Sequence, residues 1–230
     1  MNDDFHGIRA VIAGSDNHLL FFSYYPSTIC VFNLKTCEIV KSETMPVNIV
    51  TRSHCFVSKN NSANEILLFC RDVGLSIKYN EKSNTFEYHR LQVATAIRPL
   101  FMYAYVYVND SILFFGGESG YKMNISNKVF KYSITENKWM EYERTLPAPL
   151  TDCIAVLNQD NTFVHILGTL NETSALINVK VCEFMDKERQ WKFEDEGIID
   201  IENINIELSE MSQNVDIRKL KVFDFFFFFF

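Results

Sequence analysis

The chain has 230 residues, of which 47% are hydrophobic and 22% charged, and this composition predicts a folded protein with a sizeable core. Its acidic start, Met1-Asn2-Asp3-Asp4, is unlike a signal peptide, and no apolar run reaches the roughly 18 to 20 residues that a membrane helix needs. We therefore expect a cytoplasmic protein that does not enter a membrane.

The net charge of −7 is concentrated towards the C-terminus. Residues 194–224 carry nine acids against three bases, a net charge of −6, which leaves −1 for residues 1–193. A body without an excess of basic residues has no electrostatic footprint for phosphate groups. We therefore expect neither nucleic acid nor an anionic membrane surface as a partner.

The cysteines contain no CxxC pair and lie mostly inside apolar segments, where a thiol behaves as a small hydrophobic group. We therefore expect all six to be reduced and buried. They are Cys30, Cys37, Cys55, Cys70, Cys153 and Cys182.

The first predicted elements are four short strands, near residues 8–13, 18–23, 28–34 and 38–41. Polar turn residues separate the apolar runs, as in the Lys35-Thr36 turn. Two short strands closed by a tight polar turn form a hairpin. Residues 8–41 therefore predict a small antiparallel sheet.

The same order of strands and turns returns three more times along the chain. An aromatic residue is followed, seven positions later, by an aromatic or large apolar residue in four pairs: Phe32/Ile39, Tyr79/Phe86, Tyr132/Trp139 and Phe184/Trp191. The first members of successive pairs lie 47, 53 and 52 positions apart. Apolar strands that begin at Leu19, Ile66, Ile112 and Val164 keep step with them. No stretch shows helical periodicity, so the chain is predicted to be an all-β array of four repeats.

The third repeat carries a family resemblance. Its segments 112–117 and 129–139 combine an apolar strand, a double glycine, a tyrosine-bearing strand and a tryptophan after a polar turn. This pattern resembles a kelch repeat, whose period is about 50 residues. The other repeats depart from it, because Ser23-Tyr24, Arg71-Asp72 and Gly168-Thr169 replace the double glycine.

The resemblance covers residues 8–194 and implies a kelch-like β-propeller of four four-stranded antiparallel blades. A double glycine permits a sharp turn with positive φ, and large aromatic rings fill the space between blades. We therefore expect the repeated aromatic side chains to be buried: Tyr79, Tyr132, Trp139, Phe184 and Trp191.

Kelch-type propellers usually have six or seven blades, so four blades imply an incomplete propeller with an uncovered apolar face at each end. Such faces predict self-association. Residues 1–194 are expected to form the blades, and residues 195–230 an acidic tail or a partial fifth blade. The final run, Phe225–Phe230, is what a translated poly-thymine stretch would give, so a truncated reading frame is one hypothesis.

No catalytic, cofactor-binding or metal-ligating set can be identified. The histidines lack metal-ligand spacing, Gly116–Gly120 lacks the lysine of a phosphate loop, and there is no GxSxG motif. We therefore expect a protein that is not an enzyme and has no cofactor or metal. The histidines are His6, His18, His54, His89 and His165.

In a four-stranded blade, the loop between strands two and three lies on the same side as the link to the next blade. These loops are expected at Tyr24–Ser27, Arg71–Leu75, Gly116–Asn127 and Gly168–Ala175. The candidate partner-binding residues are Tyr24, Tyr25, Arg71, Asp72, Glu118, Tyr121, Lys122, Asn171 and Glu172.

The sequence thus predicts a scaffold for protein–protein interaction that binds a protein through varied loops on a rigid frame. Two alternatives remain open: an enzyme built on a propeller frame, or a truncated, non-functional gene fragment.

Overall fold

The computed structural model describes residues 4–47, 53–59, 64–120, 124–185 and 191–193, without the side chains of 4–6, 185 and 191–193. All belong to a compact unit, Met1–Glu194. The expected tail or fifth blade, residues 195–230, lies outside the described residues. The described part is built of antiparallel strands, with one short helix, α1 (Val181–Met185), so the all-β prediction is confirmed.

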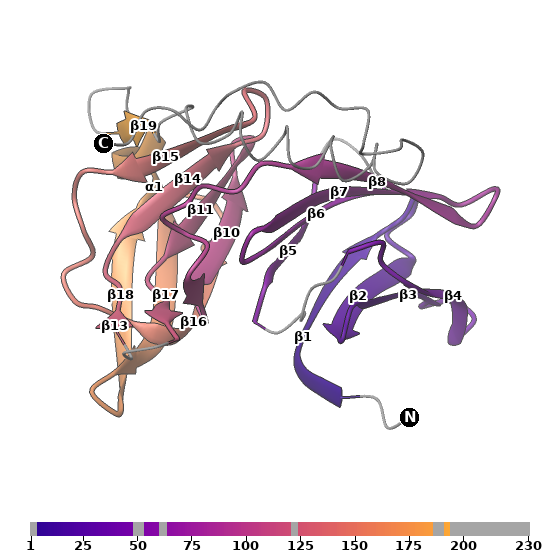
Figure 1. Ribbon diagram of the computed structural model, residues 1–230, viewed down its shortest axis with the longest axis horizontal. Coiled ribbons are helices and arrows are strands. Elements are labelled where there is room, and N and C mark those ends of the chain that lie inside the picture. The colour runs from indigo at the N-terminus through magenta and orange to yellow at the C-terminus, as the bar shows by residue number, and fades with distance from the viewer. Residues whose placement is uncertain (1–3, 48–52, 60–63, 121–123, 186–190, 194–230) are drawn as a thin grey trace, which may run out of the picture. The chain divides into compact units, whose positions relative to one another are not determined.

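The first two sheets each contain four strands that follow one another in chain order (Figure 1). The first sheet consists of β1 (Asp4–Ala13), β2 (Leu19–Tyr25), β3 (Thr28–Asn33) and β4 (Glu38–Thr44). The second sheet consists of β5 (Cys55–Ser58), β6 (Glu65–Cys70), β7 (Val73–Asn80) and β8 (Thr85–Leu91).

The turn before the last strand is built in the same way in both sheets. Asn33 Oδ1 accepts hydrogen bonds from the amides of Lys35 and Thr36, at 2.8 and 3.2 Å. Asn80 Oδ1 accepts equivalent bonds from Lys82 and Ser83, at 3.0 and 3.2 Å. An asparagine that closes its own turn in this way favours a tight hairpin, so the polar turn residues specify the repeat locally.

The third sheet has the strand order β10-β11-β14-β15-β19. Its strands are β10 (Ala104–Val108), β11 (Ser111–Phe115), β14 (Val129–Ser133), β15 (Lys138–Tyr142) and β19 (Trp191–Phe193). A small sheet beside it contains β9 (Leu100–Phe101), β12 (Glu118–Ser119) and β13 (Asn124–Ile125).

The fourth sheet has three described strands, β16 (Thr151–Leu157), β17 (Phe163–Leu170) and β18 (Thr173–Lys180), where four were expected. The expected hairpin from Phe184 to Trp191 is wrong. Phe184 lies in α1, and Trp191 begins β19, which pairs with β15 of the third sheet through Tyr142.

A shorter turn than expected explains this difference. β17 and β18 are joined by Asn171 and Glu172 alone, with φ of 46° and 65°, as in a two-residue hairpin. The predicted loop Gly168–Ala175 is therefore mostly strand, because Gly168 pairs with Ala175. The third strand of this repeat consequently ends at Lys180, before Phe184 is reached.

The core lies in three apolar clusters, each shared by two successive sheets. Four of the repeated aromatic residues are buried as predicted, with exposed fractions of 1–7%: Tyr79, Tyr132, Trp139 and Phe184. The side chain of Trp191, the fifth in the prediction, lies outside the described residues.

The first aromatic residue of the second, third and fourth repeats contacts a phenylalanine in the second strand of the preceding sheet. The ring centroids of Tyr79 and Phe21 are 5.4 Å apart, and those of Tyr132 and Phe69 are 4.7 Å apart. Phe184, although helical, lies 5.6 Å from Phe115 in β11. One type of aromatic contact therefore joins all three pairs of neighbouring sheets.

Candidate functional site

The loops between second and third strands lie beside the links between sheets. The amide of Met45 donates to the carbonyl of Ser27 at 2.8 Å, and that of Leu146 to Asn127 at 2.7 Å. This agrees with the sidedness expected from the sequence. We call this side the loop face; it comprises Tyr25 at the end of β2 and the described parts of the loops 26–27, 71–72, 116–127 and 171–172 and of the links 45–54, 92–103 and 143–150.

The small sheet joins three separate segments of the loop face. Glu118 of β12 pairs with Phe101 in the link before the third sheet and with Ile125 at the other side of its own loop. Its carboxylate also accepts a hydrogen bond from Thr151 Oγ1, at 3.0 Å, where the fourth sheet begins. The described parts of the 116–127 loop, residues 116–120 and 124–127, are thereby joined to each other and to neighbouring segments by backbone and side-chain bonds.

The double glycine allows this close approach. Gly116 has φ of 67°, and a Cβ atom there would lie 2.6 Å from the carbonyl oxygen of Leu150. Gly117 has φ of 93°, and its Cβ would lie 2.9 Å from the carbonyl of Phe101. Both positions combine left-handed backbone with direct contact to a neighbouring link, so only glycine fits without strain.

The candidate partner-binding residues have different environments. Five are exposed on the loop face: Tyr25, Arg71, Asp72, Asn171 and Glu172. Tyr24 is buried and stacks on Phe22, with ring centroids 6.0 Å apart, so its ring is not part of the exposed surface. Glu118 is half-buried through its bond to Thr151, and Tyr121 and Lys122 lie outside the described residues.

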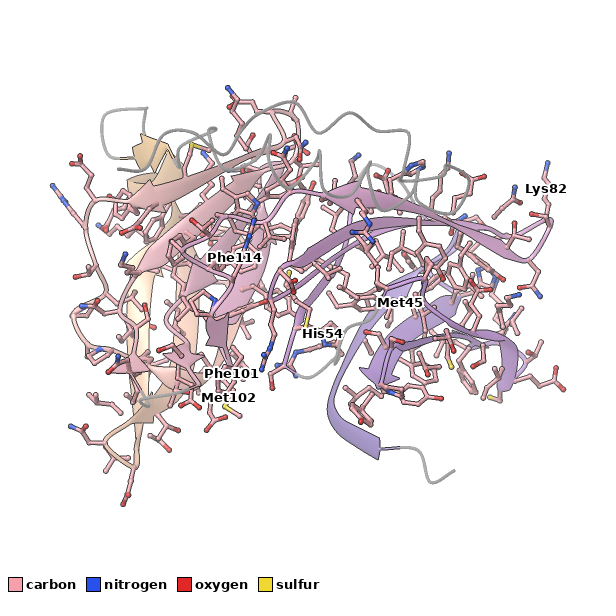
Figure 2. All side chains as sticks on the ribbon, in the orientation of Figure 1. Met45, His54, Lys82, Phe101, Met102 and Phe114 are labelled. Carbon is pink, nitrogen blue, oxygen red and sulfur yellow. The ribbon has the colours of Figure 1, made fainter. Side chains whose placement is uncertain are left out.

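A buried polar pair on this side was not identified from the sequence. Ser23 Oγ lies 2.6 Å from Nε2 of His54, whose side chain is 1% exposed and whose Nδ1 has no partner (Figure 2 labels His54). Burial, aided by the charge of Arg9, lowers the pKa of His54 to about 3, so the ring is neutral. The one available signal was that Ser23 replaces the first glycine of the repeat.

A hydrogen bond also links Arg9 of β1 to Tyr105 of β10, so these polar groups join the first sheet to the third sheet and, through His54, to the link that leads into the second. Burial raises the pKa of Tyr105, and the phenol remains protonated at neutral pH. Ser23 is fully buried, so the Ser23–His54 pair is shielded from solvent, and it bonds β2 of the first sheet to the link that leads into the second.

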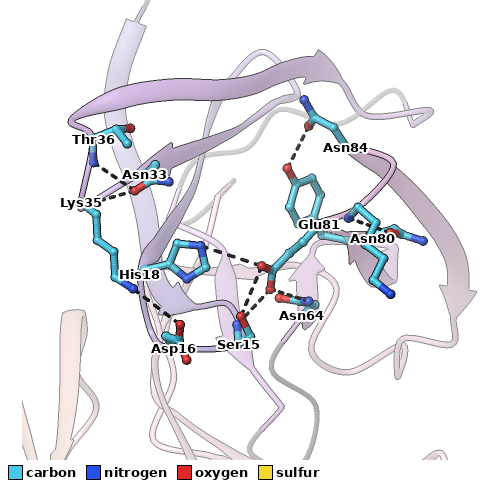
Figure 3. Close-up of polar contacts among 12 residues, drawn as sticks. Ser15, Asp16, His18, Asn33, Lys35, Thr36, Asn64, Asn80, Glu81 and Asn84 are labelled. Carbon is cyan, nitrogen blue, oxygen red and sulfur yellow. Dashed lines mark hydrogen bonds and ion pairs between the residues drawn. The ribbon is translucent and has the colours of Figure 1, made fainter.

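At the strand ends opposite the loop face, turns of the first and second sheets form an open pocket of about 540 Å³. At its side, the Glu81 carboxylate accepts bonds from the Ser15 amide and from Asn64 Nδ2, both at 2.9 Å, and lies 3.8 Å from His18 Nε2 (Figure 3). Burial favours a higher pKa for Glu81, but these bonds and the His18 charge lower it overall. The network ties the first sheet to the second. The pocket is lined by Ser15, Asn64, Lys78, Tyr79, Asn80, Glu81, Lys82 and Glu87.

The described residues contain no group of three or more His, Cys, Asp or Glu side chains that could hold a metal ion. Within the same part of the chain, no helix has the length and apolar character needed to cross a membrane. None of the six cysteines is in a disulfide. Cys37, in a turn, and Cys182, in α1, are exposed, so the prediction that all would be buried is wrong for these two.

Successive antiparallel sheets that pack face to face, with their loops and links gathered on one side, determine the architecture. The fold is that of a β-propeller. The structure is similar to that of YjhT, a protein of propeller type, with a TM-score of 0.55 and 13% sequence identity. The match covers 74% of this chain and 52% of that one, so this chain spans about half the length of YjhT. No protein-family model matches the sequence, and no curated protein is significantly similar to it.

Proposed function

We propose that this chain is a kelch-like protein-interaction module without catalytic activity, and that it binds a protein partner through the loop face. The observation that carries this proposal is the small sheet, which, together with the hydrogen bond from Thr151, anchors residues 116–120 and 124–127 of the long third-repeat loop to the neighbouring link and to β16. Loops held on a rigid frame can bind with little loss of conformational entropy.

The exposed residues of the loop face suit a protein partner. Tyr25 offers an aromatic ring. Arg71 and Asp72, which are neighbours in the two-residue turn between β6 and β7, offer opposite charges. Tyrosine and arginine are the residue types that most often dominate protein interfaces. The low net charge of residues 1–193 gives no corresponding support for a nucleic acid partner.

A cytoplasmic location belongs to the same proposal. Six unpaired thiols, two of them exposed, suit a reducing compartment better than an oxidising one. An enzyme on the same frame gains no support from Ser23 and His54, because a buried serine without access to solvent cannot reach a substrate.

The test compares partners recovered by affinity purification of the full chain and of two folded variants. Tyr25→Ala combined with Arg71→Glu alters the loop face, and Lys82→Glu makes the same charge change in an exposed turn at the opposite end. We expect the first variant to lose partners that the wild type and Lys82→Glu both retain. Partners that survive the first variant, or are lost only with the second, would contradict the proposal. Circular dichroism of each variant checks that it is folded.

A further inference from the structure

Among the described residues, the exposed large hydrophobic side chains lie in the first and fourth sheets and their turns. None of the described residues in the second or third sheet belongs to this group. The group consists of Ile8, Ile12, Tyr25, Leu34, Ile39, Val40, Ile154, Val156, Leu167 and Leu176. The described parts of the sheets with a neighbour on both sides therefore expose no large apolar side chain, whereas each of the two outer sheets exposes several.

On the first sheet, two of these residues, Ile12 and Ile39, lie at the two ends of a continuous apolar row. Ile12 pairs with Leu20, Leu20 with Phe32, and Phe32 with Ile39, so the four side chains project from one face. The neighbouring row consists of Ala10, Phe22, Cys30 and Ser42. Neither row contains a charged residue, and Ile39 is 62% exposed. An uncharged apolar face of this kind usually marks an interaction surface.

The repeat shows what this row is suited to contact. In the second sheet, Tyr79 pairs with Phe86, and both rings contact Phe21 in the second strand of the preceding sheet, at 5.4 and 6.4 Å.

In the third sheet, Tyr132 and Trp139 pair in the same way and contact Phe69, at 4.7 and 5.1 Å. Phe32 and Ile39 are the corresponding pair of the first sheet, and no described sheet precedes them.

The fourth sheet presents the other half of such a contact. Leu167, in its second strand, pairs with Ile154 and Leu176, and the three side chains are 45–59% exposed. The adjacent residue, Ile166, belongs to the cluster shared with the third sheet, so Leu167 projects from the opposite face. Its position corresponds to those of Phe21 and Phe69 on their sheets.

We propose that the fourth sheet of one copy of this chain packs on the first sheet of a second copy, with Leu167 against Phe32 and Ile39. The contact repeats the sheet-to-sheet interface that the chain already forms three times. The outer faces of the first and fourth sheets lie on the same chain, and both are nearly uncharged. A second copy therefore offers a fourth sheet to the first sheet and a first sheet to the fourth sheet. The interface is head-to-tail, joining different surfaces of the two copies.

Sedimentation velocity of the full chain over a wide concentration range tests the proposal. We expect association in the wild type, and an association at least about 100-fold weaker in both Ile39→Glu and Leu167→Glu, because each buries an unpaired charge. Thr95→Glu, at an exposed position in the link before the third sheet, should associate as the wild type does. If either variant fails to fold by circular dichroism, Ile39→Ser and Leu167→Ser replace the pair.

Mixing the two variants distinguishes head-to-tail contact from other arrangements. The Ile39→Glu copy keeps an intact fourth sheet, and the Leu167→Glu copy keeps an intact first sheet, so the mixture should form a dimer although neither variant does alone. A wild type that stays monomeric at every concentration would overturn the proposal. A mixture that stays monomeric, or an effect of one variant only, would overturn it as well.

Discussion

Ser23 Oγ and His54 Nε2 lie 2.6 Å apart, in a hydrogen bond that joins the end of β2 to the link that leads into β5. Both side chains are excluded from solvent, and the other ring nitrogen of His54 has no partner. A protonated imidazole would place an uncompensated charge beside Arg9 in this site, which is why the fold requires the neutral ring.

The first prediction concerns acid stability. Burial and the Arg9 charge lower the pKa of His54 from 6.5 to about 3 on folding. A lowered histidine pKa means that the unfolded chain takes up the proton first, so stability is fully present above pH 6.5 and is lost as the pH falls towards 3. The loss should approach about 5 kcal/mol at the acid end. Urea unfolding of the wild type and of His54→Gln between these pH values measures it.

Glutamine can still bond Ser23 but does not titrate, so His54→Gln should remove this part of the pH dependence. His89→Gln, at an exposed position in β8, is the control. Its free energy of unfolding should change with pH as that of the wild type does. If the free energy of unfolding falls equally with pH in the wild type and in His54→Gln, His54 does not govern acid unfolding.

The second prediction concerns the glycine pair of the loop face. Gly116→Ala forces a side chain into left-handed backbone and against the Leu150 carbonyl, so it should lower the free energy of unfolding by about 2–4 kcal/mol. Gly120→Ala is the matched control, because its Cβ would lie 3.5 Å from the nearest ring atom of Phe101. It should change stability by less than about 0.5 kcal/mol. Similar losses in both variants, measured by chemical denaturation, would contradict this account of the glycines.

The third prediction compares two equivalent positions of the repeat. Trp139 is buried against Phe69 and donates from Nε1 to the carbonyl of Gln92 at 2.8 Å, so Trp139→Ala should cost about 3–5 kcal/mol. Ile39, its counterpart, is 62% exposed, and Ile39→Ala should cost less than about 0.5 kcal/mol at concentrations where the chain is monomeric. A large loss for Ile39→Ala in the monomer would show that this row is covered within one chain.

The fourth prediction concerns Glu81. Its carboxylate accepts bonds from Ser15 and Asn64, so Glu81→Ala should lower stability at neutral pH by roughly 1–2 kcal/mol. Because its pKa is lowered in the fold, this contribution is present above the unfolded pKa of about 4.5 and is lost as the pH falls below it. Glu87→Ala, at an exposed position on β8, is the control. Thermal unfolding should show a larger difference between the two variants at pH 7 than at pH 3.

The strands of the first three repeats are predictable because apolar runs, polar turns and paired aromatics all recur with one period. The fourth repeat shows the limit of that reasoning. Phe184 and Trp191 keep the spacing of the pattern, yet they lie in α1 and β19 and do not pair with each other. The actual third strand, Thr173–Lys180, contains no aromatic residue and follows a turn of only two residues. Spacing alone cannot distinguish such a coincidence from a hairpin.

The loop face is predictable in its sidedness but not in its detail. Strand order places the second-to-third loops beside the links, and the hydrogen bonds from Met45 and Leu146 agree. The two-residue strands of the small sheet are too short to leave a periodic signal, and the bond between Ser23 and His54 spans 31 positions. Contacts of this kind depend on how the sheets pack, which local sequence does not encode.

The pairing of β19 with β15 has a consequence for the newly made chain. Trp191 follows its partner Tyr142 by 49 residues, and the whole fourth sheet is encoded between them. At a synthesis rate of about 5–20 residues per second, the outer edge of β15 waits roughly 2–10 s for its last strand. An unpaired edge can hydrogen-bond a strand from another nascent chain during that interval. For this edge, the pace of translation therefore contributes to correct assembly alongside the stability of the finished sheet.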